Sequence, residues 1–247
     1  MVNVVSSRAI VGVLIPSTNT VVEHDYSIMR PEGVTFHYSR CYVEEPDLST
    51  DQGVQDFIDA LGQANDVAIR NVLTCKPSFI TMGMSGETFW GGAEGNEAFE
   101  KQISTTAGLP ISTGASAVRA ALEAYGAKKL AFVSPYPPIV NEHVIRYFND
   151  HGYEVTADHG LGIQSATAIA EVTEDTLAKV LLELNESNPD VIVQAGTNLS
   201  MVRLAAAAER FLGKPVIAIN TACVWHTLRQ LGINDQYSGF GSLLSDH

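Results

Sequence analysis

Basic residues are scarce in this chain of 247 residues. Fifteen Lys and Arg stand against 28 Asp and Glu, which gives a formal net charge of -13 at pH 7. A surface this negative repels polyphosphates and anionic lipids. No apolar run approaches the ~20 residues that a membrane-spanning helix needs. We therefore expect neither nucleic acid nor a membrane as a partner.

Cysteine is also rare, and the three examples are Cys41, Cys75 and Cys223. Their odd number and their spacing fit neither a disulfide framework nor a zinc site. The chain has no His-x-x-x-His pair, no carboxylate cluster and no GxxxxGK[ST] motif, and no GxGxxG opens a helix after the first strand. These absences predict a site without metal or cofactor, and the unpaired cysteines indicate a reducing, cytoplasmic setting.

Short β-branched segments alternate with longer segments that carry apolar residues every three or four positions. This alternation predicts an α/β protein with parallel sheets and right-handed crossovers. The expected strands are Ala9–Ile15, Val34–Val43, Ser78–Gly83, Pro110–Thr113, Lys129–Ser134, Tyr153–Ala157, Asp190–Ala195 and Pro215–Ile219. The expected helices include Val54–Leu73, Asn96–Ala107, Ser116–Tyr125, Val140–Asp150, Glu174–Asn185 and Met201–Phe211.

Three segments of the first half resemble three of the second half, in the same order. The longest pair is GLPISTGASAVRAALEAYGA from Gly108 and GKPVIAINTACVWHTLRQLGI from Gly213. A tandem duplication predicts two similar halves of four strands each; a chance likeness between ordinary α/β segments is the alternative. We place an N-terminal lobe at residues 1–115 plus 225–247 and a C-terminal lobe at residues 116–224.

Ligands of parallel sheets bind outside the carboxyl ends of the strands, so six loops are expected to face one cleft. They contain Ser, Thr, Asn and Gly but neither Lys nor Arg, a composition that suits a small carboxylate held by uncharged donors. For any single loop, an ordinary helix N-cap is the better explanation of these polar residues, but six such loops on one side of the sheet favour a binding site. The loops are Pro16–Thr20, Gly83–Gly92, Thr113–Ser116, Ser134–Pro138, Gly196–Ser200 and Asn220–Thr221.

Two side chains in the second loop are candidates for chemistry. Glu87 stands beside Phe89 and Trp90, and apolar neighbours would raise its pKa and suit it to general acid or base catalysis. The alternative is an exposed glutamate in a mobile loop. Ser85 lies in GMSGE, which begins like the GxSxG nucleophile elbow but ends in Glu87 and lacks an obvious His partner.

Other polar residues are expected to be structural. His226 follows Trp225 on the last long helix, where packing is more common than catalysis. Glu23, His24 and Asp25 are expected on the solvated face of a helix.

Four segments resemble a known superfamily: PSTNTVVEHD (16–25), SPYPPIVNE (134–142), GTNLS (196–200) and INTACVWHTL (219–228). They resemble the aspartate/glutamate racemase superfamily, and within it the branch of maleate cis–trans isomerases and arylmalonate decarboxylases. The resemblance spans nearly the whole chain. It implies two pseudo-symmetric flavodoxin-like halves, each a four-stranded parallel sheet flanked by helices, with a cofactor-free site for a small carboxylate in the cleft between them.

The resemblance also implies roles for residues. It makes Asn19 and Tyr136 carboxylate-binding groups and places Ser85, Thr197 and Asn198 beside the substrate. Together with the loops, the expected substrate-binding residues are Ser17, Asn19, Gly83, Met84, Gly196, Thr197 and Asn198, and the expected catalytic residues are Glu87, Ser85 and Tyr136.

The family's cysteines are missing from this chain. Racemases and maleate isomerases of this kind carry two facing cysteines and the decarboxylases one, at positions that match Gly83 and Gly196 here. Cys223 lies elsewhere, and a packed thiol is its expected role. Chemistry that starts from a thiolate therefore lacks its nucleophile.

Three functions remain open. The favoured one is a cofactor-independent lyase or isomerase of the decarboxylase/isomerase type, which stabilises an enediolate-like anion of a small carboxylic acid and moves the proton with Glu87 or Tyr136. The second is a hydrolase of an amide, imide or lactone that uses Glu87 or Ser85. The third is a carboxylate-binding protein without catalysis. The architecture is also compatible with a homo-oligomer.

Overall fold

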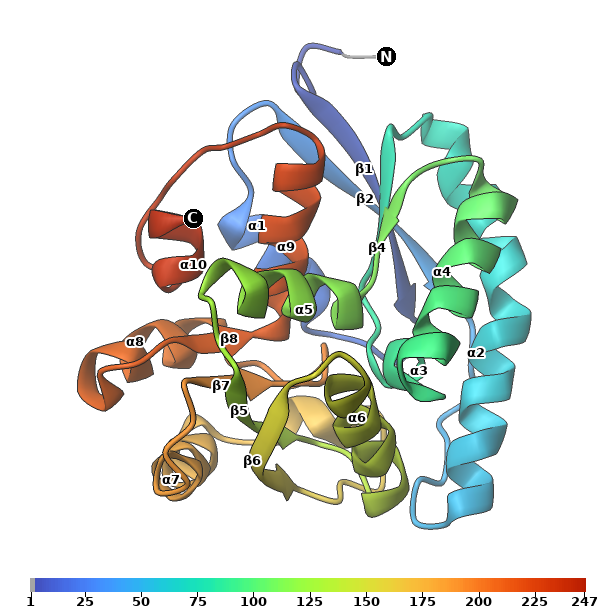
Figure 1. Cartoon of the computed structure of the whole chain (residues 1–247). Helices are drawn as coiled ribbons and strands as arrows, with labels where there is room; N and C mark the ends of the chain where they lie inside the picture. Colours follow the sequence, from blue (N-terminus) through green and yellow to red (C-terminus); the bar gives the residue numbers. More distant parts are fainter. Residues whose placement is uncertain (1–2) are drawn as a thin grey trace.

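Two four-stranded parallel sheets form the two halves of the protein (Figure 1), as the computed structural model shows for residues 3–247. The strand order is β2-β1-β3-β4 in the first sheet and β6-β5-β7-β8 in the second, so both halves have the same topology. This is the arrangement that the sequence repeat predicts, and all eight expected strands are present. They are β1 (Ala9–Pro16), β2 (Val34–Cys41), β3 (Phe79–Met82), β4 (Ile111–Ser112), β5 (Lys129–Ser134), β6 (Glu154–Gly160), β7 (Val191–Gln194) and β8 (Val216–Ala218).

Helices cover the sheets. They are α1 (Val22–Met29), α2 (Asp51–Val72), α3 (Gly86–Phe89), α4 (Gly92–Ala107), α5 (Gly114–Ala124), α6 (Pro138–Asp150), α7 (Glu174–Asn185), α8 (Val202–Leu212), α9 (Ile219–Gln230) and α10 (Ser242–Asp246). Thr50, Thr113 and Thr173 accept backbone N–H groups at the starts of α2, α5 and α7, as N-caps do. None of the helices within residues 3–247 is long and apolar enough to cross a membrane.

The central strands are buried on both faces, which explains their continuous apolar sequences. Every residue of β1 is buried, and so is every residue of β3 and β7. Gly12 in β1 lets α2 approach closely, because a Cβ there would lie 3.0 Å from a methyl of Val72. The strands are therefore fixed between two helical layers, and their carboxyl ends are left to build the site.

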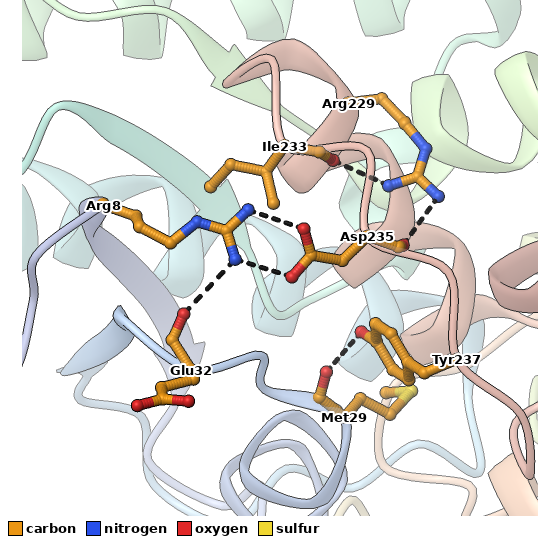
Figure 2. Close-up of polar contacts among 7 residues, drawn as sticks. All are labelled: Arg8, Met29, Glu32, Arg229, Ile233, Asp235 and Tyr237. Carbon is orange, nitrogen blue, oxygen red and sulfur yellow. Dashed lines mark hydrogen bonds and ion pairs between the residues drawn. The ribbon is translucent and has the colours of Figure 1, made fainter.

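The C-terminal segment returns to the first half of the chain. Figure 2 shows the Arg8 guanidinium paired with both carboxylate oxygens of Asp235 at 2.6 Å, and the Tyr237 hydroxyl donating to the carbonyl of Met29. Arg229, near the end of α9, stabilises the turn that follows this helix by donating to the carbonyl of Ile233 at 2.7 Å and to that of Asp235. Asp235 and Tyr237 thus contact the first half of the chain, whereas Gly239 and Ser242 bond Arg203 and Glu209 of the second half. The assignment of residues 225–247 to the N-terminal lobe stays a prediction.

Helix α1 differs from the expectation at one residue. Glu23 and His24 are exposed as expected, but Asp25 is 1% exposed, so its assignment to a solvated face was wrong. Its carboxylate accepts a 2.7 Å hydrogen bond from the Asn220 side chain, and burial raises the pKa of Asp25. The i, i+3 and i, i+4 neighbours of Asp25 do not reveal that α9 lies against this face of α1.

Candidate active site

One cavity lies where the carboxyl ends of β1, β3, β5 and β7 come together, between the two halves. Among residues 3–247, neither Lys, Arg nor His lines it. The lining has a polar side, formed by the loops after these strands, and an apolar side. Its members are Pro16, Thr18, Asn19, Leu48, Val54, Phe57, Ile58, Leu61, Met84, Ser85, Gly86, Glu87, Pro135, Tyr136, Pro137, Val140, Ala166, Ile169, Gly196, Thr197 and Asn198.

Two hydroxyl groups from opposite halves meet in this cavity. Ser85 Oγ lies 2.5 Å from Tyr136 Oη, and the backbone N–H of Thr197 donates to Ser85 Oγ at 3.2 Å. The Ser–Tyr contact uses one hydroxyl proton, so the second proton of the pair is free to donate to a ligand. Burial raises the pKa of Tyr136, which keeps this donor protonated at neutral pH.

Asn19 and Thr197 link the two halves. The side-chain oxygen of Asn19 accepts the N–H groups of Val21 and Val22 at 3.0 Å, which orients the amide group. The amide nitrogen donates to Thr197 Oγ1 at 3.3 Å, and that hydroxyl donates to the carbonyl of Gly83 at 3.0 Å. Because an amide carries two N–H groups, one remains for a ligand.

Asn198 lines the cavity and also bonds two neighbouring loops. Its side chain donates to the carbonyl of Ala166 at 2.9 Å and accepts the N–H of Thr20 at 3.0 Å. The bond to Thr20 joins the two halves, the bond to Ala166 lies within the second half, and one N–H of the amide is left, as in Asn19.

The apolar side was not anticipated from the sequence. Helix α2 contributes Val54, Phe57, Ile58 and Leu61, whose i, i+3, i+4, i+7 spacing is also that of an ordinary core-facing helix. Further apolar lining residues are Leu48, Val140, Ala166 and Ile169. The spacing of α2 predicted a buried face correctly but could not show that part of this face borders a cavity.

Glu87 is the one carboxyl group of the lining. It is 8% exposed, and its Oε1 is buried without a hydrogen-bond partner in the described chain. Loss of hydration disfavours the carboxylate, and burial accordingly raises the pKa of Glu87 from 4.5 to about 7. Of the two interpretations of Glu87, the buried carboxyl is confirmed and the exposed loop residue is not.

This raised pKa predicts a pH-dependent stability. The folded protein binds the Glu87 proton more tightly than the unfolded chain does, so the stabilisation is complete below pH 4.5 and is lost as the pH rises through about 7. A shift of this size corresponds to about 3 kcal/mol. Urea unfolding across this interval should therefore show wild type losing stability relative to Glu87→Gln, whereas the exposed Glu94→Gln control should follow wild type. Parallel curves for wild type and Glu87→Gln would contradict the assignment.

The positions that match the family's cysteines are closed to side chains. A Cβ at Gly83 would lie 2.4 Å from a methyl of Ile15. Gly196 has φ +111°, and a Cβ there would lie 2.5 Å from the Cδ of Pro135. The chain's own cysteines do not replace them, since none of the three lines the cavity. Burial raises the pKa of Cys41 and of Cys223 to about 12, as expected of packed thiols.

Replacement of Gly196 by alanine should destabilise the protein by about 2–3 kcal/mol, because strain in the backbone adds to a clash with Pro135. Thermal unfolding measures the effect. Gly62→Ala is the matched control, since a Cβ at this exposed helical position meets no atom within 4 Å and should be neutral or stabilising. A Gly196→Ala protein as stable as wild type would show that the loop can relax enough for a side chain.

Two expected site residues lie outside the lining. Ser17 joins β1 to the end of β2, because its hydroxyl donates to the carbonyl of Val43 at 3.1 Å and accepts the N–H of the same residue at 3.0 Å. Gly83 contributes its carbonyl to Thr197 but does not border the cavity. The other expected residues, Asn19, Met84, Ser85, Glu87, Tyr136, Gly196, Thr197 and Asn198, all line it.

Two of the six loops that were expected in the cleft serve the scaffold. Thr113 and Ser116 form a reciprocal capping box at the start of α5. Asn220 bonds the carbonyl of Thr197 at 3.0 Å as well as Asp25. His226 is packed as expected: Ser112 bonds its ring nitrogen at 2.7 Å, and burial lowers the pKa of His226 to about 4.

Known proteins resemble this chain in architecture and in sequence. The family model described as arylmalonate decarboxylase matches residues 11–244. The chain belongs to the arylmalonate decarboxylase family. The expected relationship to the branch of maleate isomerases and arylmalonate decarboxylases is thereby confirmed.

Individual known proteins are similar to this chain over more than half of its length. A maleate isomerase from Pseudomonas putida is 26% identical over 256 residues, which cover 95% of this chain and 96% of the relative. An arylmalonate decarboxylase from Bordetella bronchiseptica is 29% identical over 148 residues, 59% of this chain and 61% of the relative. The structure of a Nocardia farcinica maleate cis–trans isomerase variant with a covalently bound succinylcysteine intermediate is also similar to this chain. The TM-score is 0.87 at 21% identity, and the match covers 97% of this chain and 99% of that chain. This likeness confirms the fold.

Proposed function

We propose that this protein is a cofactor-independent enzyme that decarboxylates or isomerises a small carboxylic acid through an enediolate-like anion. The observation that carries the proposal is one cavity that combines uncharged hydrogen-bond donors, an apolar wall and a buried carboxyl group with a raised pKa. Membership of a family whose relatives are maleate isomerases and arylmalonate decarboxylases supports it.

The polar side provides the anion-binding groups. The free N–H of Asn19 and the free hydroxyl proton of the Ser85–Tyr136 pair are neutral donors fixed by their other hydrogen bonds. Preoriented dipoles in a site with little water stabilise charge that develops on carboxylate oxygens in the transition state. The apolar wall of α2 suits an uncharged substituent of the same acid.

Glu87 provides the proton transfer. A carboxyl group whose pKa is near neutrality can both donate and accept a proton at physiological pH. A neutral carboxyl also tolerates a carboxylate substrate beside it, which an ionised one would repel. Because none of the three cysteines lines the cavity, we assign Glu87 the acid–base role rather than a thiol.

The proposal is tested with maleate and a series of aryl- and alkyl-substituted malonates. We expect one class of acid to be turned over, with isomerisation or CO₂ release accompanied by a solvent deuteron at carbon. Incorporation of ¹⁸O from water without deuterium would show a hydrolase instead. Acids that stabilise the protein thermally but are never converted would show a binding protein.

A further inference from the structure

Glu87 borders two separate spaces. It lines the substrate cavity, and it also lines a surface groove between α2 and α4. Ile58 is the other residue common to both linings. Figure 1 shows α2, α3 and α4 side by side on the same flank of the molecule, with the short α3 that carries Glu87 at the edge of the first half.

The groove is open to water. Asp59, Gln63 and Gln102 give it exposed polar side chains. The space beside Gly62 of α2 is open, since a Cβ at this position would meet no atom within 4 Å. The groove therefore brings solvent up to Glu87 from the side away from the substrate cavity, while Oε1 of the carboxyl group stays buried.

The titratable neighbours of Glu87 are poor proton relays. Burial, with a contribution from the charge of Glu87, raises the pKa of Cys41 to about 12. Burial likewise raises the pKa of Tyr136, again with a contribution from Glu87. Both groups hold their protons at neutral pH, so neither readily passes a proton on to a Glu87 carboxylate. Water on the groove side is the better source.

We propose that Glu87 regains its proton from solvent through the groove between α2 and α4 while the substrate cavity is still occupied. This inference rests on the proposed function, in which Glu87 transfers the proton. In a decarboxylation the C–C bond breaks, CO₂ leaves, and its electron pair stays on the α-carbon as an enediolate. The Glu87 O–H proton then goes to that carbon, and a proton from groove water restores the carboxyl group.

The test follows the protonation of Glu87 directly. Time-resolved infrared spectroscopy records its carboxyl C=O stretch after a pH jump, and Glu87→Gln identifies the band by its loss. The substrate cavity is blocked in two independent ways, with phenylacetate as a non-reactive acid and with the substitution Ala166→Phe, which needs no ligand. Gly62→Leu fills the groove, and Asp56→Leu is the control on an exposed position of α2 outside the groove.

With the cavity blocked, Gly62→Leu should slow the protonation of Glu87 several-fold, while wild type and Asp56→Leu keep the rate of the open protein. In turnover, Gly62→Leu should lower kcat several-fold and leave KM unchanged. A wild-type rate in the blocked Gly62→Leu protein would overturn the groove route, and so would a block that slows wild type by itself.

The groove route and the proposed function fail in different ways. If Glu87→Gln keeps full turnover, the proposed role of Glu87 is wrong whatever the groove variants do. If Glu87→Gln is inactive and the blocked Gly62→Leu protein still protonates at the wild-type rate, the groove route alone is wrong.

Discussion

Replacement of Glu87 by glutamine is expected to lower kcat by about 100- to 10,000-fold and to change KM little. Glutamine keeps the size of the side chain beside the apolar wall but cannot exchange a proton at neutral pH. Because carbon protonation is lost while the donors of the carboxylate remain, the effect should fall on the chemical step and not on binding. Steady-state kinetics on the acid that is turned over, with deuterium incorporation as a second measurement, give the result.

Loss of the fold cannot account for this effect, since the Gln variant removes a buried ionisable group and should be at least as stable as wild type above neutral pH. Glu94→Gln makes the same chemical change at an exposed position of α4 and should keep full activity. A Glu87→Gln enzyme with wild-type kcat would move the proton transfer to another group, with Tyr136 as the next to test.

Removal of the Tyr136 hydroxyl is expected to lower kcat/KM by about 100-fold, which is the usual cost of one donor to a developing oxyanion. Tyr136→Phe keeps the ring in the lining and deletes only the Oη that lies 2.5 Å from Ser85. Ser85→Ala should have an effect of the same order, because it removes the hydroxyl that fixes the orientation of the Tyr136 donor. Kinetics of both single variants measure the cost.

A double-mutant cycle separates a shared donor from two independent ones. The double variant Ser85→Ala, Tyr136→Phe should have a kcat/KM little below that of the less active single variant, since either change already breaks the pair. If the fold-losses of the two single variants multiply in the double variant, the two hydroxyls act independently. A Ser85→Ala loss far larger than that of Tyr136→Phe would instead favour serine as a nucleophile and hence hydrolysis. No histidine hydrogen-bonds Ser85 in the portion of the chain described, which speaks against that outcome.

Much of the fold could be predicted because each strand is a short apolar run that ends at a change of composition. The run Ala9–Ile15 is buried on both faces and can form only a central strand in such a fold. The repeat then gave the second sheet the topology of the first. Helix ends were less accurate: α4 begins at Gly92 and not at Asn96, since Gly91 with φ +80° turns the chain into the helix earlier than the apolar spacing starts.

The candidate site was predicted only in part, because a polar residue after a strand has several destinations. Asn19 borders the cavity, but Ser17, two positions earlier, points to the next strand. The sequence does not specify which of the polar side chains in this loop points into the cavity and which points to the neighbouring strand. The burial of Glu87 depends on where α2 and α4 lie, so its two interpretations could be separated only by tertiary structure. The apolar wall was missed for the same reason.

The central claim is that uncharged donors of both halves hold an organic acid next to Glu87. A crystal structure of the protein with phenylacetate, a non-reactive acid, tests it most directly. We predict a carboxylate within hydrogen-bond distance of Asn19 and of the Ser85–Tyr136 pair, a ring against the wall of α2, and the Glu87 carboxyl beside the α-carbon. An acid bound elsewhere, or a cavity that stays closed to it at saturating concentration, would contradict the account.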